Sequence, residues 1–225
     1  RFHRPRFGQW NFGLLRRGTA RRRQACRLDF DADAQFELLD DIANLVGLAG
    51  ERAQPRVPLP RPGKIICVGL NYAAHTAESP YKQADYPTVF LRVATTLTAH
   101  GKPIVRPQAS EELDFEGELL AIIGRGGKHI KKENALDHVI AYSIFNESSI
   151  RNYQFKSPQW TVGKNFDSTG AFGPYVVTSD ELPKGGKGIH LETRLNGEIM
   201  QSSSTEDMIF DVATIIEVLS EAMTL

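Results

Sequence analysis

The 225-residue sequence is poor in cysteine, in net charge and in long apolar runs. Its two cysteines, Cys26 and Cys67, are too few for a disulfide framework, which favours a reducing, cytoplasmic location. No run approaches the roughly 18 apolar residues of a membrane span, so none is expected. Basic and acidic residues both number 27, and this balance argues against a nucleic-acid binder driven by overall charge.

Acidic residues are absent from positions 1–28, which hold nine arginines. An arginine-rich, acid-poor start can be a transit peptide, but this one has little serine and no clean amphipathic pattern. We therefore prefer a solvated face of a small N-terminal module. The sequence begins with Arg1 and ends at Leu225, straight after a helical pattern. We expect further sequence beyond its C-terminal end.

Four prolines between residues 55 and 63 indicate a domain boundary. Such a stretch cannot continue a helix and favours extended structure. We divide the chain into a small N-terminal module (1–54), a proline-rich linker (55–63) and a main domain (64–225). Within the module, residues 34–48 have the apolar spacing of a helix.

Short apolar runs predict a strand-rich main domain. They cover residues 64–70, 88–92, 118–124, 138–145 and 173–178. Asn196 and Gly197 form the preferred turn pair of a tight hairpin over residues 191–201. Asp211 can cap a last amphipathic helix. Many strands with few helices between them indicate a β-rich, mixed α/β (α+β) fold and argue against a doubly wound sheet.

Two acidic residues, Glu116 and Glu118, stand just before the apolar run of residues 119–123. On a strand, residues two apart point to the same face. Two like charges on a core-bound strand are costly to bury, and a hard divalent cation would remove that cost. The alternative, favoured by spacing alone, is an edge strand with ordinary exposed acids.

The polar segment 146–154 follows a strong strand, where ligands are often bound. Glu147 could supply a third carboxylate, and Arg151 could hold a substrate carboxylate through a bidentate pair. A capped strand-to-helix turn is the alternative. Farther upstream, His75 and Glu78 are three residues apart on a predicted short helix. This pair could form a general base, or simply an exposed ion pair.

Lys164 lies in the glycine-containing segment 160–167 and could stabilise a developing negative charge. A lone lysine in a loop is more often solvated. Other catalytic signatures are absent from the sequence. It has no phosphate-binding loop, no dinucleotide fingerprint, no zinc-ligand spacing and no Gly-x-Ser-x-Gly elbow.

Taken together, five segments resemble the fumarylacetoacetate hydrolase family. They are KIICVGLNYAAHTAES (64–79), LDFEGELLAIIGR (113–125), NESSIRNYQ (146–154), WTVGKNFDSTGAFGP (160–174) and LNGEIMQSSSTEDMIFDVATIIEVLS (195–220). The resemblance covers roughly residues 62–225 in order and spacing, and is far more specific than any single motif. It implies rolled, mixed β-sheets around a divalent metal site, and a homodimer.

The resemblance also implies roles for individual residues. The implied ligands of Mg²⁺ or Mn²⁺ are Glu116, Glu118 and Glu147. The implied catalytic residues are His75, Glu78, Lys164 and Gln154. The implied substrate-binding residues are Arg151, Lys164 and Gln154.

The implied activity is metal-dependent cleavage of a carbon–carbon bond in a small 2-oxo or 2,4-dioxo acid. An acylpyruvate or oxaloacetate would be hydrolysed or decarboxylated through a metal-stabilised enolate. The alternatives are an isomerase or hydratase of aromatic catabolism, or a non-catalytic relative that binds a metabolite.

Three departures from the family pattern stand out. Glu147 is one methylene longer than the usual Asp, and Asn152 replaces the acid that follows the arginine. Family members also continue beyond the position of Leu225 into further strands and a glycine-rich loop. We therefore expect the main domain to lack its C-terminal strands.

Overall fold

The computed structural model describes residues 10–15, 56–73 and 85–225, and its central element is a strand that ends in Glu147. This strand, β7, has nine residues, of which eight are buried. β6 pairs antiparallel with one edge of β7, and β10 and β9 pair with the other edge. The sheet comprises β4 (Leu97–Ala99), β6 (Gly117–Ile123), β7 (Val139–Glu147), β9 (Gly170–Phe172) and β10 (Val177–Thr178).

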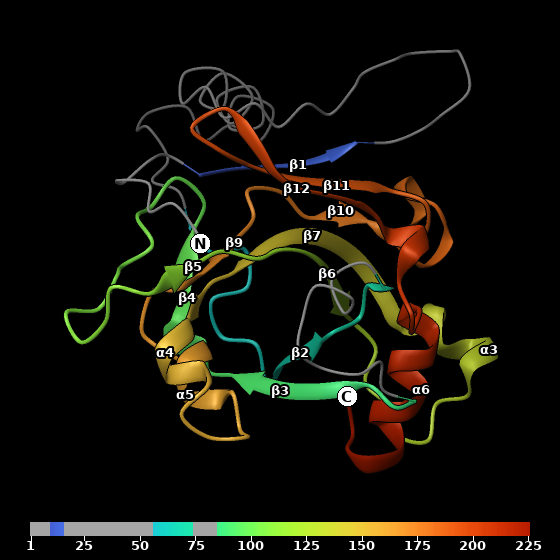
Figure 1. The fold of residues 1–225 in the computed structure, drawn as a ribbon. Coiled ribbons are helices and arrows are strands. Elements are labelled where there is room, and N and C mark those ends of the chain that lie inside the picture. The colour runs from blue at the N-terminus through green and yellow to red at the C-terminus, as the bar shows by residue number, and fades with distance from the viewer. Residues whose placement is uncertain (1–9, 16–55, 74–84) are drawn as a thin grey trace, which may run out of the picture.

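A three-stranded antiparallel sheet lies across the top of the described part of the chain in Figure 1. Its strands are β1 (Trp10–Leu15), β11 (His190–Leu195) and β12 (Glu198–Ser204). β11 alternates half-buried and buried residues, as a strand with one covered face must. β1 comes from the stretch assigned to the N-terminal module and pairs with β11. The module boundary at residue 54 stays a prediction.

The turn between β11 and β12 confirms the predicted hairpin. Asn196 and Gly197 both have positive φ, 53° and 84°, as a two-residue turn of the favoured hand requires. Two further sheets of the described residues have two strands each. They pair β2 (Ile65–Gly69) with β3 (Thr88–Arg92), and β5 (Leu113–Asp114) with β8 (Ser149–Ile150).

Within the described residues, the α-helices are short except the last. They are α3 (Lys132–Ala135), α4 (Arg151–Gln154), α5 (Thr161–Lys164) and α6 (Val212–Ala222). The side chain of Asp211 accepts a hydrogen bond of 2.8 Å from the Thr214 N–H, which confirms the predicted cap of α6. Val212 and Ile216 of α6 pack with Tyr142 of β7 in the larger apolar core.

The structure confirms a mixed α/β fold with several sheets, and most predicted strands. The prediction of a strand over residues 173–178 is wrong in extent. Gly173 has a φ of 105° and Pro174 has no N–H to donate, so pairing stops at Phe172 and resumes at Val177. The predicted helix at 34–48 lies outside the described residues. Among the helices that are described, none is long and apolar enough to cross a membrane.

Candidate active site

Three carboxylates meet where β6 begins and β7 ends. Glu116 immediately precedes β6, and its carbonyl oxygen accepts a 2.8 Å hydrogen bond from the Glu147 N–H. Glu118 lies within β6, opposite Phe145 of β7. We call Glu116, Glu118 and Glu147 the carboxylate cluster. Antiparallel pairing thus brings together acids that are about 30 residues apart in the chain.

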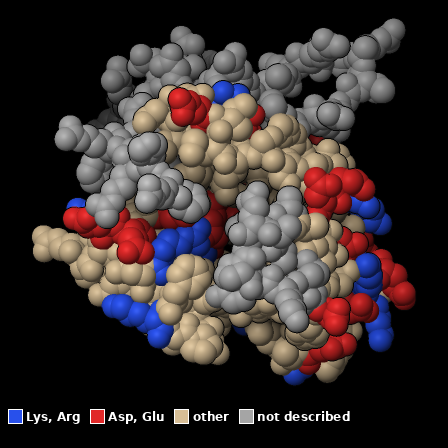
Figure 2. All heavy atoms as spheres, viewed as in Figure 1, with Lys and Arg blue, Asp and Glu red and all other residues tan. Residues whose placement is uncertain are grey.

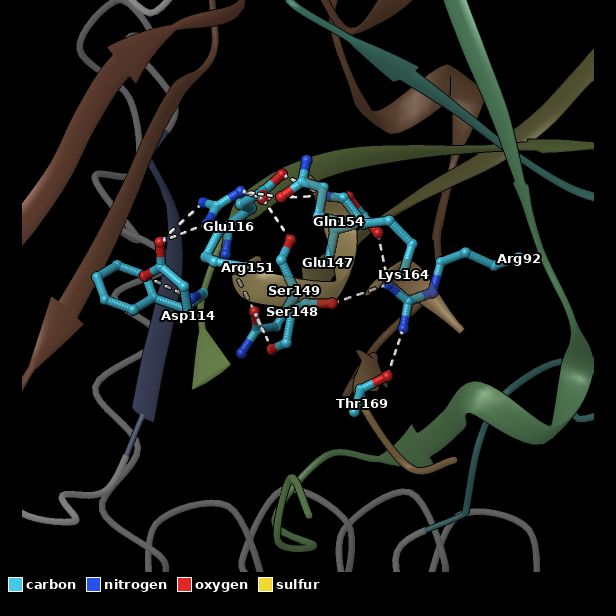
Figure 3. A network of polar contacts seen from close by, with 12 residues as sticks. Arg92, Asp114, Glu116, Glu147, Ser148, Ser149, Arg151, Gln154, Lys164 and Thr169 are labelled. Carbon is cyan, nitrogen blue, oxygen red and sulfur yellow. Dashed lines mark hydrogen bonds and ion pairs between the residues drawn. The ribbon is translucent and has the colours of Figure 1, made fainter. Parts of the chain in front are cut away.

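Lys164 joins two members of this cluster (Figure 3). Its Nζ lies 2.9 Å from each carboxylate oxygen of Glu116 and also donates to Oε2 of Glu147. The side chain is only 2% exposed, so the interpretation of a solvated loop lysine is wrong. Burial by itself lowers the pKa of Lys164, but the charges of Glu116 and Glu147 outweigh it and raise the pKa above its ordinary value.

Close packing of two short helices brings Lys164 to the cluster. α5 ends at Lys164, and Gly163 of α5 packs directly against the backbone of Gln154 in α4. A Cβ on Gly163 would lie 2.3 Å from the Gln154 backbone nitrogen. Only glycine permits this approach.

The cluster carboxylates differ in protonation because they differ in partners. Burial raises the pKa of Glu116, but Lys164 and Arg151 outweigh it and lower the pKa to about 2. Burial raises the pKa of Glu118 to about 8, and the charges of Glu116 and Glu147 add to the effect. Burial also raises the pKa of Glu147, to about 7. Glu118 therefore keeps its proton at neutral pH, whereas Glu116 is ionised.

Arg151 and Gln154, the predicted substrate-binding pair, lie beside Glu116. The Arg151 Nη1 donates to Gln154 Oε1 at 2.8 Å and lies 2.8 Å from Glu116 Oε1. The Nε and Nη2 of the same guanidinium lie 2.8 Å from Asp114 Oδ2. Asn152, in place of the family's acid, accepts instead from the Ser110 hydroxyl at 2.6 Å. Asp114 thus orients Arg151, a role that the sequence pattern did not reveal.

Arg92 is a second residue that sequence reasoning missed. Its side chain is fully buried, and its Nη1 lies 2.5 Å from Glu147 Oε1. A basic residue at the end of a predicted strand carries no signal for such a role, because its partner is 55 positions away.

Two predicted catalytic residues, His75 and Glu78, lie outside the described residues. The described chain leads toward them through Asn71, whose side-chain amide donates to the Phe210 carbonyl and accepts from the Phe210 N–H, both at 2.9 Å. Tyr72 follows, and burial together with Glu118 and Asp207 raises the pKa of its hydroxyl. On the face drawn in Figure 2, acidic and basic side chains meet at a hollow near the centre.

The carboxylate cluster has the chemistry of a site for a hard divalent cation. Three buried or half-buried carboxyl groups supply oxygen ligands, and a bound Mg²⁺ or Mn²⁺ would favour the ionised form of Glu118 over the protonated form. As the side chains stand, no group of three His, Cys, Asp or Glu residues among those described could hold a metal ion. The Lys164 ammonium lies between Glu116 and Glu147. The metal centre stays a prediction.

Comparison with known proteins shows the family and agrees with the fold. Residues 64–225 match the family described as fumarylacetoacetate (FAA) hydrolase C-terminal. A Bacillus subtilis protein named oxaloacetate tautomerase YisK is 40% identical over 172 residues, which cover 75% of this chain and 57% of that protein.

Two solved structures are also similar. One, named fumarylacetoacetate hydrolase, from Exiguobacterium antarcticum, is 40% identical with a TM-score of 0.67, covering 75% of this chain and 61% of that one. The other, 5-carboxymethyl-2-hydroxymuconate delta-isomerase from Mycobacterium smegmatis, is 33% identical with a TM-score of 0.64, covering 72% and 63%. The chain spans less than two thirds of the length of each of these three relatives.

Proposed function

The chain belongs to the fumarylacetoacetate hydrolase family, and from that membership we propose that it tautomerises a small 2-oxo dicarboxylic acid such as oxaloacetate. In this reaction a C–H bond next to the carbonyl breaks and an O–H bond forms on the carbonyl oxygen. The observation that carries the proposal is the buried ammonium of Lys164 beside acidic groups, where an enolate oxygen would gain a fixed positive partner.

The names of the relatives support proton transfer as the common step. One is named an oxaloacetate tautomerase and another a delta-isomerase. Both kinds of reaction move a proton without breaking a carbon–carbon bond. This favours the isomerase alternative over the hydrolase or lyase that the sequence resemblance first suggested.

Each residue of the site has a part in this proposal. Arg151 and Gln154 would hold a substrate carboxylate, with Arg151 exchanging one of its present acceptors for it. Lys164 holds its proton because Glu116 and Glu147 raise its pKa, and its Nζ would donate to the developing enolate oxygen. His75, oriented by Glu78, is the predicted acceptor of the proton from carbon.

Glu116, Glu118 and Glu147 would hold the metal. A bound Mg²⁺ or Mn²⁺ would act as a Lewis acid toward the carboxylate and 2-oxo oxygens of the substrate. The charges of the carboxylate cluster are otherwise balanced mainly by Lys164, Arg92 and Arg151.

Cleavage of a carbon–carbon bond stays a second prediction, because it passes through the same kind of enolate. It is favoured by the relative named fumarylacetoacetate hydrolase. Hydrolysis needs an attacking water that His75 would activate, whereas decarboxylation and tautomerisation do not.

The test follows oxaloacetate in the presence of Mn²⁺. The enol is measured by its ultraviolet absorbance and pyruvate is measured in the same samples. We expect faster approach to keto–enol equilibrium than in buffer with the same Mn²⁺, and no pyruvate above that control. Lys164→Met should lower the rate about 100- to 1,000-fold, the effect of removing one charge-stabilising donor.

Lys187→Met is the matched control, because Lys187 also forms an ion pair, with Glu206 at 3.0 Å, but is 59% exposed. It should leave the rate unchanged. A wild-type rate equal to that of buffer would contradict the tautomerase proposal. Rapid formation of pyruvate would instead favour the lyase.

A further inference from the structure

Arg92 is a buried charge that the proposed mechanism does not use. It lies at the end of β3, and its side chain is 0% exposed. A guanidinium in that position is costly unless its donors are satisfied by fixed acceptors. What surrounds it therefore indicates what it does.

Four donor contacts hold the guanidinium, and Figure 3 shows its partners Glu147, Ser148 and Thr169. Nε donates to the Thr96 hydroxyl at 3.3 Å, and Nη2 donates to the Thr169 hydroxyl at 2.8 Å. Nη1 donates to the Ser148 carbonyl at 3.1 Å and to Glu147 Oε1 at 2.5 Å. Three of these acceptors are neutral groups of the scaffold, and Glu147 is the single carboxylate among them.

Packing fixes the plane of the guanidinium as well. Its central carbon lies 5.6 Å from the centre of the Phe145 ring, within the range of a cation–π contact. Gly170 leaves the space that the group occupies, because a Cβ there would lie 3.2 Å from Arg92 Nη2 and 2.6 Å from Phe145. Contacts that do not involve Glu147 therefore hold the Arg92 guanidinium in place.

The two oxygens of Glu147 have different partners. Oε1 accepts from Arg92, and Oε2 accepts from Lys164, which also contacts Glu116. Rotation of the carboxylate would break both ion pairs. Oε2 is thus the oxygen linked, through Lys164, to Glu116.

From this arrangement we infer that Arg92 is a positioning residue that fixes the Glu147 carboxylate so that a single oxygen, Oε2, serves the site. The inference rests on the proposed function in taking Glu147 as a metal-binding residue. Glu147 has one more rotatable bond than the family's usual Asp, and Arg92 removes the freedom that this bond adds. A residue that orients a ligand in this way typically contributes about 10- to 100-fold to metal affinity or activity.

The test is a double-mutant cycle read by the dissociation constant of Mn²⁺, measured by calorimetry on the full chain. Arg92→Lys keeps the charge but loses the planar fork. We expect it to weaken Mn²⁺ binding about 10- to 100-fold. In a Glu147→Asp background, whose shorter side chain does not reach Arg92, the same change should have less than about a threefold effect.

Two further variants separate positioning from folding. Thr169→Val leaves both charges in place and removes one anchor of the guanidinium, so it should weaken Mn²⁺ binding in the wild-type background only. Arg194→Lys alters another 2.5 Å ion pair, with Glu192, and should leave Mn²⁺ affinity unchanged. A merely structural role of Arg92 would lower the unfolding midpoint without changing Mn²⁺ affinity.

The outcomes are distinguishable from those of the proposed function. Equal effects of Arg92→Lys in the two backgrounds would overturn the inference, and so would a wild-type chain that binds no Mn²⁺. If the cycle shows coupling but oxaloacetate is not tautomerised, the proposed function fails and the positioning role of Arg92 stands.

Discussion

Glu116 and Glu118 are two residues apart, yet their pKa values lie on opposite sides of the ordinary value. Glu116 has Lys164 and Arg151 as partners and a pKa of about 2, whereas Glu118 has a pKa of about 8. Burial raises the pKa of both carboxyl groups, so the difference between them comes from the cations beside Glu116. Neighbouring acids with separated pKa values are a frequent mark of a functional site.

The raised pKa of Glu118 predicts how stability depends on pH without metal. Because the folded state binds this proton more tightly than the unfolded state, the stabilisation is complete below about pH 4.5 and is lost as pH rises through about 8. Glu147 acts in the same direction. Burial lowers the pKa of His100 from 6.5 to about 4, so this residue reduces stability as the pH falls below about 6.5 and has little effect above it.

Urea unfolding with a chelator should therefore show lower stability at about pH 8.5 than at about pH 6.5, by on the order of 1–3 kcal/mol. Glu118→Gln should remove most of this difference in stability between the two pH values. Glu206→Gln is the control, since Glu206 is exposed in its pair with Lys187. A difference that is unchanged in Glu118→Gln would contradict the assignment.

Two four-residue helices position the residues that face the cluster. α4 carries Arg151 and Gln154, and α5 carries Lys164. Such helices have little stability of their own, so their positions depend on packing against each other. Gly163, at the contact, is the position on which this packing depends most.

Gly163→Ala should displace α5, because its Cβ would lie 2.3 Å from the Gln154 nitrogen and 2.4 Å from its Cα. We expect a loss of about 1–3 kcal/mol in unfolding free energy, the usual cost of overpacking. The proposed tautomerase activity should fall further than stability accounts for, since Lys164 moves with the helix.

Activity and urea unfolding of the same preparation check this expectation. Gly63→Ala is the matched control, because nothing lies within 4 Å of the Cβ that it adds. Wild-type activity in Gly163→Ala would show that α5 need not stay in contact with α4.

Sequence patterns predicted the elements that are long or carry a distinctive turn. The runs that became β2, β3, β6 and β7 and the Asn196-Gly197 hairpin were found in this way. β9 has three residues and depends on pairing with β7, so no local pattern marked it, and the run over residues 173–178 marked β10 but not its short extent.

The candidate site was predictable to a different extent. Sequence patterns singled out Glu116, Glu118 and Lys164 as candidates, and the resemblance was needed to favour a functional role for them. Arg92 and Asp114 were missed because their roles arise from contacts 55 and 37 positions along the chain. His75 and Glu78 stay predictions.

At the scale of the whole molecule, the site is assembled from distant segments around β7. The ends of β3, β6 and β7 supply Arg92, Glu118 and Glu147, and Glu116 immediately precedes β6. The helices α4 and α5 supply Arg151, Gln154 and Lys164. The described residues form this site within one chain. Association is therefore a separate question.

The family resemblance predicts a homodimer. Light scattering coupled to size exclusion should give twice the chain mass of 25.1 kDa. The measurement should be repeated at lower protein concentration and with Mn²⁺, so that weak association is detected. A mass of one chain under all conditions would contradict the prediction.

Both edges of β7 are paired, and this has a consequence for how the molecule opens. The Glu147 end of β7 is buried and lies between β6 and β9. Its amides should exchange with solvent deuterium only when the whole domain unfolds. Thus the strand that carries a predicted metal ligand should also be the last to open, and ligand binding should slow its exchange by the full amount that it stabilises the fold.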